Sequence, residues 1–228
     1  MAATTPPPRS AFTRRELAVI DRCRTPAQVQ QFLNTALRYD HHRVGRTLRS
    51  FRGVLRDGKI HCMEAALAAA VILEQHGYPP LLVSLESQDD LDHVLFVFRH
   101  RGRWGAVARS RDAGLHGRRP VYRSIRDLVW SYFEPYVDFT GRITGYALVD
   151  LRTIAPYDWR LNRRNLWWLE RYLIAYPHTP LRSSDRRYRR LLRRFEAFKR
   201  AHPEGPVDYY ASRRHWMWPG RKGWRRAN

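Results

Sequence analysis

CMEAALAAAVIL, residues 62–73, is the most apolar segment of the chain. Alanine and leucine favour helix, and apolar side chains all round a helix indicate burial on every side. Gly77 can end such a helix, and Pro79 and Pro80 prevent its continuation. The segment therefore predicts a central, buried helix that begins at Cys62.

Strands are expected after this helix, because short runs with alternating apolar residues follow it. These strands are residues 81–85, 93–99, 104–109 and 143–151. Arg101-Gly102 is expected to form a two-residue hairpin loop, which pairs positions whose numbers sum to 203. A further helix should start near Ser124. Helices followed by an antiparallel meander indicate an α+β fold, with the helix headed by Cys62 packed on the sheet.

Two helix starts are predicted upstream. Thr13 with Glu16, and Thr25 with Gln28, have the spacing of capping boxes. The second helix is expected to run to about Tyr39, followed by a polar stretch to Gly58. Residues 1–12, which contain three consecutive prolines, are expected to be a flexible tail, and residues 13–155 the α+β core.

Residues 156–228 are predicted to be a basic, aromatic-rich helical extension. They carry 19 Lys and Arg against 6 Asp and Glu, whereas residues 1–155 carry 23 against 15. Helices are expected over residues 165–176 and 184–202, with a loose end bearing Trp216, Trp218 and Trp224. Such a surface can bind nucleic acid or an anionic partner, or can simply be a solvated face of an Arg-rich chain.

The rest of the composition excludes several classes of protein. No apolar run is long enough to span a membrane, and residues 1–15 do not have the pattern of a signal peptide, so a cytoplasmic location is expected. With only Cys23 and Cys62, and no zinc-type spacing of His and Cys, we expect neither a disulfide framework nor a metal or other cofactor.

Cys62 and His93 are the candidate catalytic pair. A cysteine at a helix N-terminus lies where free N–H groups and the helix dipole favour the thiolate. A histidine within reach completes an activated pair, and the N–H of Cys62 is a natural oxyanion donor. The alternative is that Cys62 is a buried, inert thiol, as free cysteines commonly are.

The segments Gly58-Lys59-Ile60-His61-Cys62-Met63-Glu64-Ala65-Ala66 and Asp92-His93-Val94, with Trp104 after a turn, resemble the transglutaminase-like family of the papain-like cysteine superfamily. The match covers about residues 55–112. The resemblance implies a transglutaminase-like core in which Cys62 is the nucleophile and His93 the general base and acid.

One position departs from the family pattern. The family commonly has an Asp four residues after the Trp to orient the histidine, but Ala108 stands there. In the expected hairpin register, Ser110 lies opposite His93 and Asp112 lies diagonally on the same face. Register favours Ser110 and chemistry favours Asp112, whereas Asp92 should point to the other face.

Two functions therefore remain open from the sequence. The first is a thiol enzyme that hydrolyses or transfers acyl groups at amide bonds of a peptide or similar substrate, through a Cys62 thioester. Arg109 and Arg111 near the site would suit a carboxylate-bearing substrate. The second is a catalytically degenerate transglutaminase-like domain that binds an anionic partner or nucleic acid through its basic C-terminal region.

Overall fold

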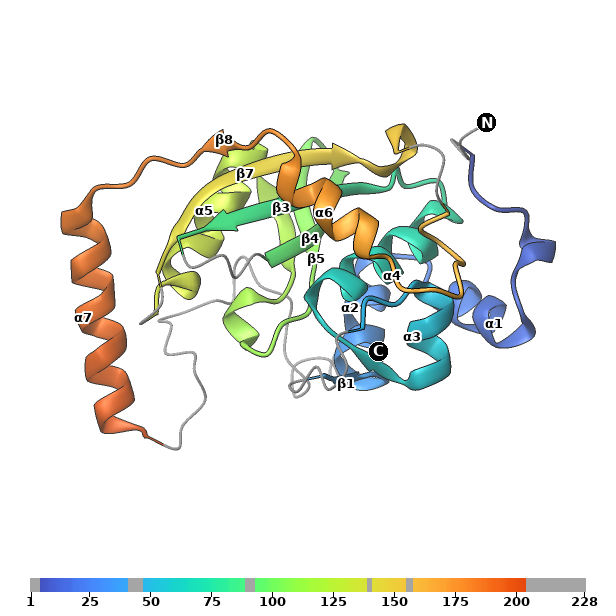
Figure 1. Ribbon diagram of the computed structural model, residues 1–228, viewed down its shortest axis with the longest axis horizontal. Coiled ribbons are helices and arrows are strands. Elements are labelled where there is room, and N and C mark those ends of the chain that lie inside the picture. Colours follow the sequence, from blue (N-terminus) through green and yellow to red (C-terminus); the bar gives the residue numbers. More distant parts are fainter. Residues whose placement is uncertain (1–4, 41–46, 89–92, 139–140, 155–157, 204–228) are drawn as a thin grey trace.

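The computed structural model describes residues 5–40, 47–88, 93–138, 141–154 and 158–203. Within these residues, a six-stranded antiparallel sheet carries helices on both faces (Figure 1). The helices are α1 (Arg14–Arg22), α2 (Pro26–Thr35), α3 (Phe51–Asp57), α4 (Cys62–Glu74), α5 (Ile125–Tyr136), α6 (Trp167–Ala175) and α7 (Asp185–Ala201), with 3-10 turns η1 (Arg9–Ala11), η2 (Ala113–Leu115) and η3 (Leu151–Thr153). The strands are β1 (Arg38–Tyr39), β2 (Lys59–Ile60), β3 (Leu81–Ser87), β4 (His93–His100), β5 (Arg103–Val107), β6 (Arg118–Tyr122), β7 (Ile143–Asp150) and β8 (Thr179–Pro180). The α+β class is confirmed.

The sheet has the strand order β6-β5-β4-β3-β7-β8, so β3 to β6 form a meander and β7 returns beside β3. Between β4 and β5, Arg101 and Gly102 both have positive φ, 47° and 75°, as a tight two-residue hairpin requires. The pairs run from His100 with Arg103 to Phe96 with Val107. The predicted loop and register are therefore both confirmed.

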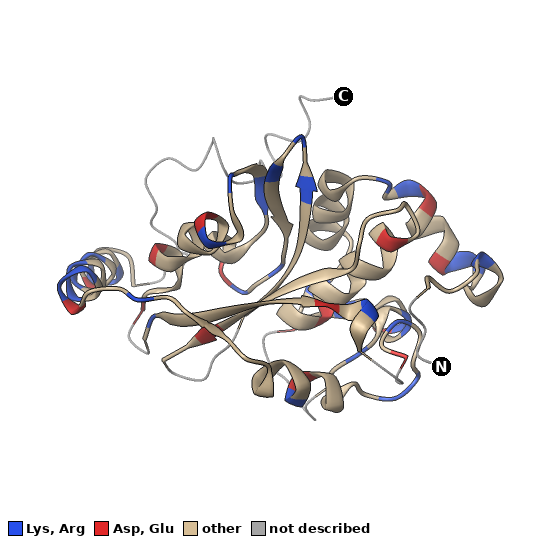
Figure 2. Ribbon diagram, turned by 90° about the horizontal axis from the view of Figure 1, so that it is seen from above, with Lys and Arg blue, Asp and Glu red and all other residues tan. Residues whose placement is uncertain are grey.

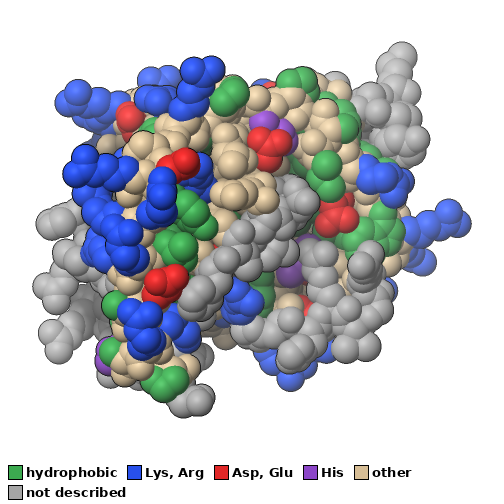
Figure 3. Space-filling view, turned by 60° about the vertical axis from the view of Figure 1, so that its left-hand side comes forward, with side chains coloured by type: hydrophobic (Ala, Val, Ile, Leu, Met, Phe, Trp, Pro, Cys, Tyr) green, Lys and Arg blue, Asp and Glu red, His purple; other side chains and the backbone are tan. Residues whose placement is uncertain are grey.

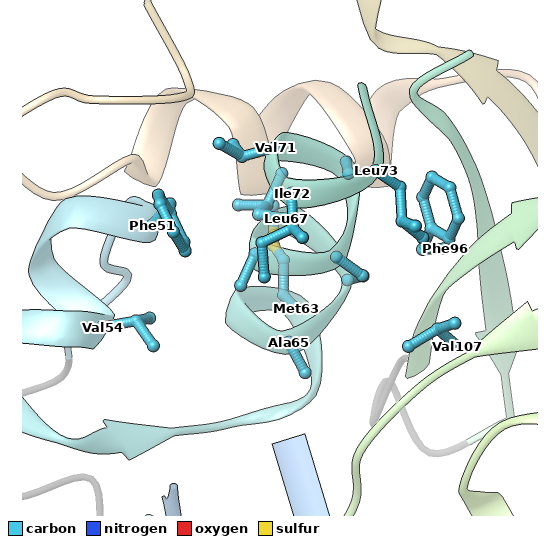
Figure 4. Packing of buried hydrophobic residues seen from close by; sticks show 14 of the residues in the cluster. Phe51, Val54, Met63, Ala65, Leu67, Val71, Ile72, Leu73, Phe96 and Val107 are labelled. Atoms are coloured by element: carbon cyan, nitrogen blue, oxygen red, sulfur yellow. The ribbon is translucent and has the colours of Figure 1, made fainter. Parts of the chain in front are cut away.

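Helix α4 is the centre of the larger hydrophobic cluster, and it begins at Cys62 as predicted. Its short alanine side chains let α2, α3 and β4 pack close around it, and its residues from Met63 to Glu74 are buried (Figure 4). Gly77, with φ of 82°, follows the end of the helix. Full burial of each leucine or isoleucine here contributes roughly 1.5–3 kcal/mol to stability.

The orientation of α4 relative to β4 decides what lies near Cys62. Leu73, at the end of α4, lies beside Phe96 in Figure 4. The ring of Tyr78, after the helix, meets that of Phe98, near the end of β4, with centroids 6.4 Å apart. The two elements therefore run in the same direction, and both begin at one end of the molecule.

Side chains on the two faces of β4 enter different clusters. Val94, Phe96 and Phe98 pack on the α4 face. Leu95 and Val97 pack on the opposite face, against α5. The alternation predicted for this strand is confirmed, and it places α4 and α5 in separate layers.

The N-terminal segment differs from expectation in three ways. Both capping boxes form as predicted, but α2 ends at Thr35, because Arg38 and Tyr39 pair with β2 as a short parallel strand. The stretch expected to be polar contains α3, capped by Ser50. Within the expected tail, residues 9–11 form η1 and Phe12 is buried in the cluster of α4.

The C-terminal segment packs on both layers. Leu169 and Leu173 of α6 join the cluster of α4, and Leu191 of α7 joins that of α5. Helix α7 stands at the opposite end of the molecule from α1 (Figure 1). The predicted helices of this segment are confirmed with slightly shorter bounds, whereas Trp216, Trp218 and Trp224 lie outside the described residues.

Gln30 of α2 marks the point where β5 leaves the sheet. Its side-chain amide donates to the Ala108 carbonyl at 2.9 Å and accepts from the Ala108 N–H at 3.0 Å. Both residues are fully buried, so the amide satisfies two backbone groups that no neighbouring strand reaches. The chain is thereby directed out of the sheet after Val107.

We expect Gln30→Ala to lower the free energy of unfolding by about 2–3 kcal/mol, because it leaves a buried N–H and C=O without partners. Urea denaturation measures the change. Gln31→Ala, on the exposed side of the same helix, is the matched control and should cost under about 0.5 kcal/mol. Equal costs for the two variants would contradict the role given to Gln30.

Candidate active site

Cys62 is the first residue of α4, and its side chain is partly exposed, whereas Cys23 is buried. His61 precedes it in extended conformation, with φ of −117° and ψ of −178°. The first-turn N–H groups of a helix have no partners within the helix. Cys62 therefore combines a reachable thiol with a helix N-terminus, as the sequence predicted.

A buried carboxylate fixes this helix start. Glu64, fully buried, accepts from the His61 N–H at 3.0 Å and from the Arg49 N–H at 2.7 Å. The Arg49 guanidinium also pairs with it, at 3.1 Å, and reaches Asp40 and Asp57 at 3.0 and 2.9 Å. The network ties the residues before Cys62 to β1 and α3, and so holds the thiol in one place.

His93 opens β4, and its ring lies on the α5 face of the sheet. Its Nε2 lies 2.9 Å from the Leu115 carbonyl, and its ring centroid is 6.1 Å from that of Tyr132. Burial lowers the pKa of His93 to about 4, and the nearby Arg118 guanidinium acts in the same direction. His93 is therefore neutral at pH 7.

The structure brings Cys62 and His93 to the same end of the molecule, because α4 and β4 both begin there. Among the described residues, the hydrogen bond of the His93 ring is made to the Leu115 carbonyl. The ring lies on the face of β4 opposite to Val94, which packs with α4. The His93 ring and α4 therefore lie on opposite faces of the sheet.

Ser110 and Asp112, the two predicted orienting residues, follow the point where β5 leaves the sheet. The Ser110 hydroxyl accepts from the Asp112 N–H at 3.3 Å, and the Asp112 carboxylate lies 3.4 Å from Arg111. The partner of the His93 Nε2 is the Leu115 carbonyl and not the side chain of Ser110 or Asp112. The pairing of β4 with β5 ends at Phe96 and Val107, before the position where the hairpin register would place Ser110 opposite His93. An orienting role for Ser110 or Asp112 stays a prediction.

The sequence did not indicate His116, which also lies in this region. Its Nε2 is 3.0 Å from the Ser110 carbonyl and 3.3 Å from Nη1 of Arg109. Burial lowers the pKa of His116 to about 4, and Arg109 adds to the effect. His116 follows η2 in an irregular segment, where no periodic pattern could have indicated it.

Other features of the described residues bear on cofactors and location. No group of three or more His, Cys, Asp and Glu among them could hold a metal ion. None of the helices in this part of the chain is both long and apolar enough to cross a membrane.

We expect stability to fall as the pH is lowered from 6.5 to 5. In this window the unfolded chain protonates His93 and His116 while the folded chain keeps them neutral, so each can contribute up to about 1.4 kcal/mol per pH unit. Carboxylates remain ionised in both states over most of the window. Urea denaturation at several pH values measures the slope.

His93→Gln should reduce this slope by about half, because glutamine can still donate to the Leu115 carbonyl but does not titrate. His100→Gln, at the exposed end of the same strand, is the control and should keep the full slope. A slope unchanged by His93→Gln would contradict the burial of a neutral imidazole.

Comparison with known proteins yields a distant structural similarity. No protein-family profile matches the sequence, and no curated protein matches it. Calcium-bound Legionella pneumophila LapG has a TM-score of 0.38 and 12% identity, over 72% of this chain and 94% of LapG. The EGTA-treated form has a TM-score of 0.36 and 12% identity, over 64% of this chain and 83% of LapG. With TM-scores and an identity this low, no role of a LapG residue can be assigned to a residue of this chain.

Proposed function

We propose that this chain is a thiol enzyme that hydrolyses or transfers acyl groups at amide bonds, with Cys62 as nucleophile and His93 as general base and acid. One observation carries the proposal. The partly exposed thiol of Cys62 opens α4 at the end of the molecule where β4 opens with His93. The proposal includes a transglutaminase-like core for residues 13–155 and a cytoplasmic location, and both stay predictions.

The chemistry follows from the helix start. His93 takes the proton of the Cys62 thiol and becomes an imidazolium. The Cys62 thiolate attacks the amide carbonyl, and the Cys62 N–H, at the head of α4, stabilises the oxyanion that forms. Collapse of this intermediate breaks the C–N bond, and the imidazolium gives its proton to the leaving amine. Water or a second amine then attacks the thioester and releases Cys62.

The hydrogen bond of His93 sets the tautomer for this step. A carbonyl oxygen can only accept, so the neutral ring carries its proton on Nε2 and its lone pair on Nδ1. The Leu115 carbonyl thus orients the ring, which is the part that a carboxylate plays in a catalytic triad. A carbonyl stabilises the imidazolium less than a carboxylate does, so we expect modest rates, consistent with Ala108 at the position of the family's Asp.

Alkylation of Cys62 with iodoacetamide across pH tests the proposal. We expect a reaction midpoint well below the ordinary thiol value of about 8.5, because the N-terminus of α4 favours the thiolate. Peptide mass spectrometry separates Cys62 from Cys23, whose thiol pKa is raised by burial and which serves as the internal control. A pH midpoint of Cys62 alkylation near 8.5 would contradict the proposal.

A second candidate function rests on α7. Seven of its arginines are exposed, and Lys and Arg crowd this end of the molecule in ribbon and space-filling views (Figures 2 and 3). Arg189, Arg190 and Arg193 have no acidic partner within the described residues. In this alternative the core is catalytically degenerate, and α7 binds nucleic acid or another anionic partner.

A salt titration of binding to single-stranded DNA distinguishes the alternative. If α7 binds the phosphates, affinity should fall steeply with salt, and Arg189→Gln with Arg193→Gln should reduce the slope of log affinity against log salt by about 1–2. The matched control changes Arg14 and Arg15, both exposed on α1, to Gln. No binding at low salt, or equal effects of the two pairs, would rule out α7 as the binding surface.

A further inference from the structure

Arg109 is a partly buried cation for which the described residues supply no carboxylate partner. It stands two residues beyond β5, and its Nη1 contacts the Asn34 Oδ1 at 3.4 Å and the His116 Nε2 at 3.3 Å. Its Nε is fully buried and makes no hydrogen bond within the described residues. The Nε–Nη2 edge of the guanidinium is therefore not used by the described part of the chain.

The groups around Arg109 do not neutralise its charge. Asn34 is uncharged, and His116 is neutral at pH 7 because burial lowers its pKa to about 4. Burial also lowers the pKa of Arg109 itself, against a smaller opposing effect of Tyr39. A desolvated charge without an opposite charge is costly, so a protein that keeps one commonly uses it.

Two other arginines of this fold, the buried Arg160 and the half-buried Arg52, have carboxylate partners. The guanidinium of Arg160 forms two hydrogen bonds with Glu74, of 2.6 and 2.7 Å. Arg52 pairs with the buried Glu16 at 2.7 and 2.9 Å. The fold therefore supplies a carboxylate to these two arginines, whereas the part of the chain that the structure describes supplies none to Arg109.

The position of Arg109 connects it to the candidate active site. Tyr39, which interacts with Arg109 electrostatically, lies in β1 opposite Ile60, two residues before Cys62. On its other side, Arg109 contacts His116, whose pKa a positive charge on His93 also lowers. Arg109 thus lies at the end of the molecule that carries both proposed catalytic residues.

We propose that Arg109, a partly exposed residue, binds a carboxylate of the substrate through its guanidinium. This inference rests on the proposed function and adds the class of substrate: an amide that carries a free carboxylate near the bond to be attacked. Arg–carboxylate pairs with two parallel hydrogen bonds are strong and directional, so they fix the position of a substrate as well as its affinity.

Thermal unfolding with small carboxylates tests the site without requiring activity. We expect N-acetylglycine to raise the unfolding midpoint of the wild-type protein in proportion to the logarithm of its concentration. Uncharged N-acetylglycinamide should have no such effect. An N-acetyl glutamate amide, whose carboxylate is on the side chain, tells whether the preferred group is a terminal or a side-chain carboxylate.

Arg109→Met keeps the aliphatic stem and removes the charge, so the carboxylate-dependent shift should disappear. The variant should be at least as stable as the wild type without ligand, since an unpaired buried charge has been removed. Arg111→Met is the matched control, because Arg111 is exposed on the same segment, and it should keep the full shift. Arg109→Lys, which keeps the charge but loses the donor fork, should weaken the apparent affinity at least several-fold.

The proposal is overturned if the wild type gains no midpoint shift from either carboxylate, or if Arg109→Met and Arg109→Lys both keep the wild-type shift. The labelling of Cys62 tests the enzymatic proposal independently of the carboxylate site. A Cys62 labelling midpoint near 8.5 together with an Arg109-dependent shift would leave an anion site beside an unreactive thiol.

Discussion

The buried carboxylate of Glu64 is the interaction on which the end of the molecule with Cys62 depends. It binds the N–H groups of His61 and Arg49 and the Arg49 guanidinium, and through Arg49 it is linked to Asp40 and Asp57. Removing either member of such a pair leaves a buried charge uncompensated, which costs about 3–5 kcal/mol. The first turn of α4 is thereby held rigid, and a rigid helix start is what a nucleophile and an oxyanion donor require.

The sheet then determines where the two proposed catalytic residues lie. Alternation along β4 directs Val94 toward α4 and His93 toward α5, so the two proposed catalytic groups share an end of the molecule but not a layer. Gln30 directs the chain out of the sheet at Ala108, which brings η2 and its Leu115 carbonyl to the His93 ring. The orientation of the His93 ring thus comes from a backbone carbonyl in this fold.

Much of the fold could be predicted because periodic patterns and turn chemistry act locally. The apolar run from Cys62, the two capping boxes and the Arg101-Gly102 loop fix α4, two N-terminal helices and the register of the hairpin. β1 and α3 could not be predicted, since β1 depends on pairing with distant residues and α3 is short and rich in arginine. The site was harder to predict. The sequence indicated Arg109 near it, but His116 and the Leu115 carbonyl lie where the chain has left the sheet, and only tertiary contacts place them there.

Formation of an acyl-enzyme is the most direct test of the central claim that Cys62, assisted by His93, is a nucleophile for acyl groups. The protein would be mixed with p-nitrophenyl acetate, and the acetylated residue and its rate of formation would be followed by mass spectrometry. The structure predicts acetylation of Cys62 at a rate that falls roughly 100-fold in His93→Gln, the size of effect typical of a lost general base. Acetylation of Cys62 at the same rate in both proteins, or none at Cys62, would contradict the claim.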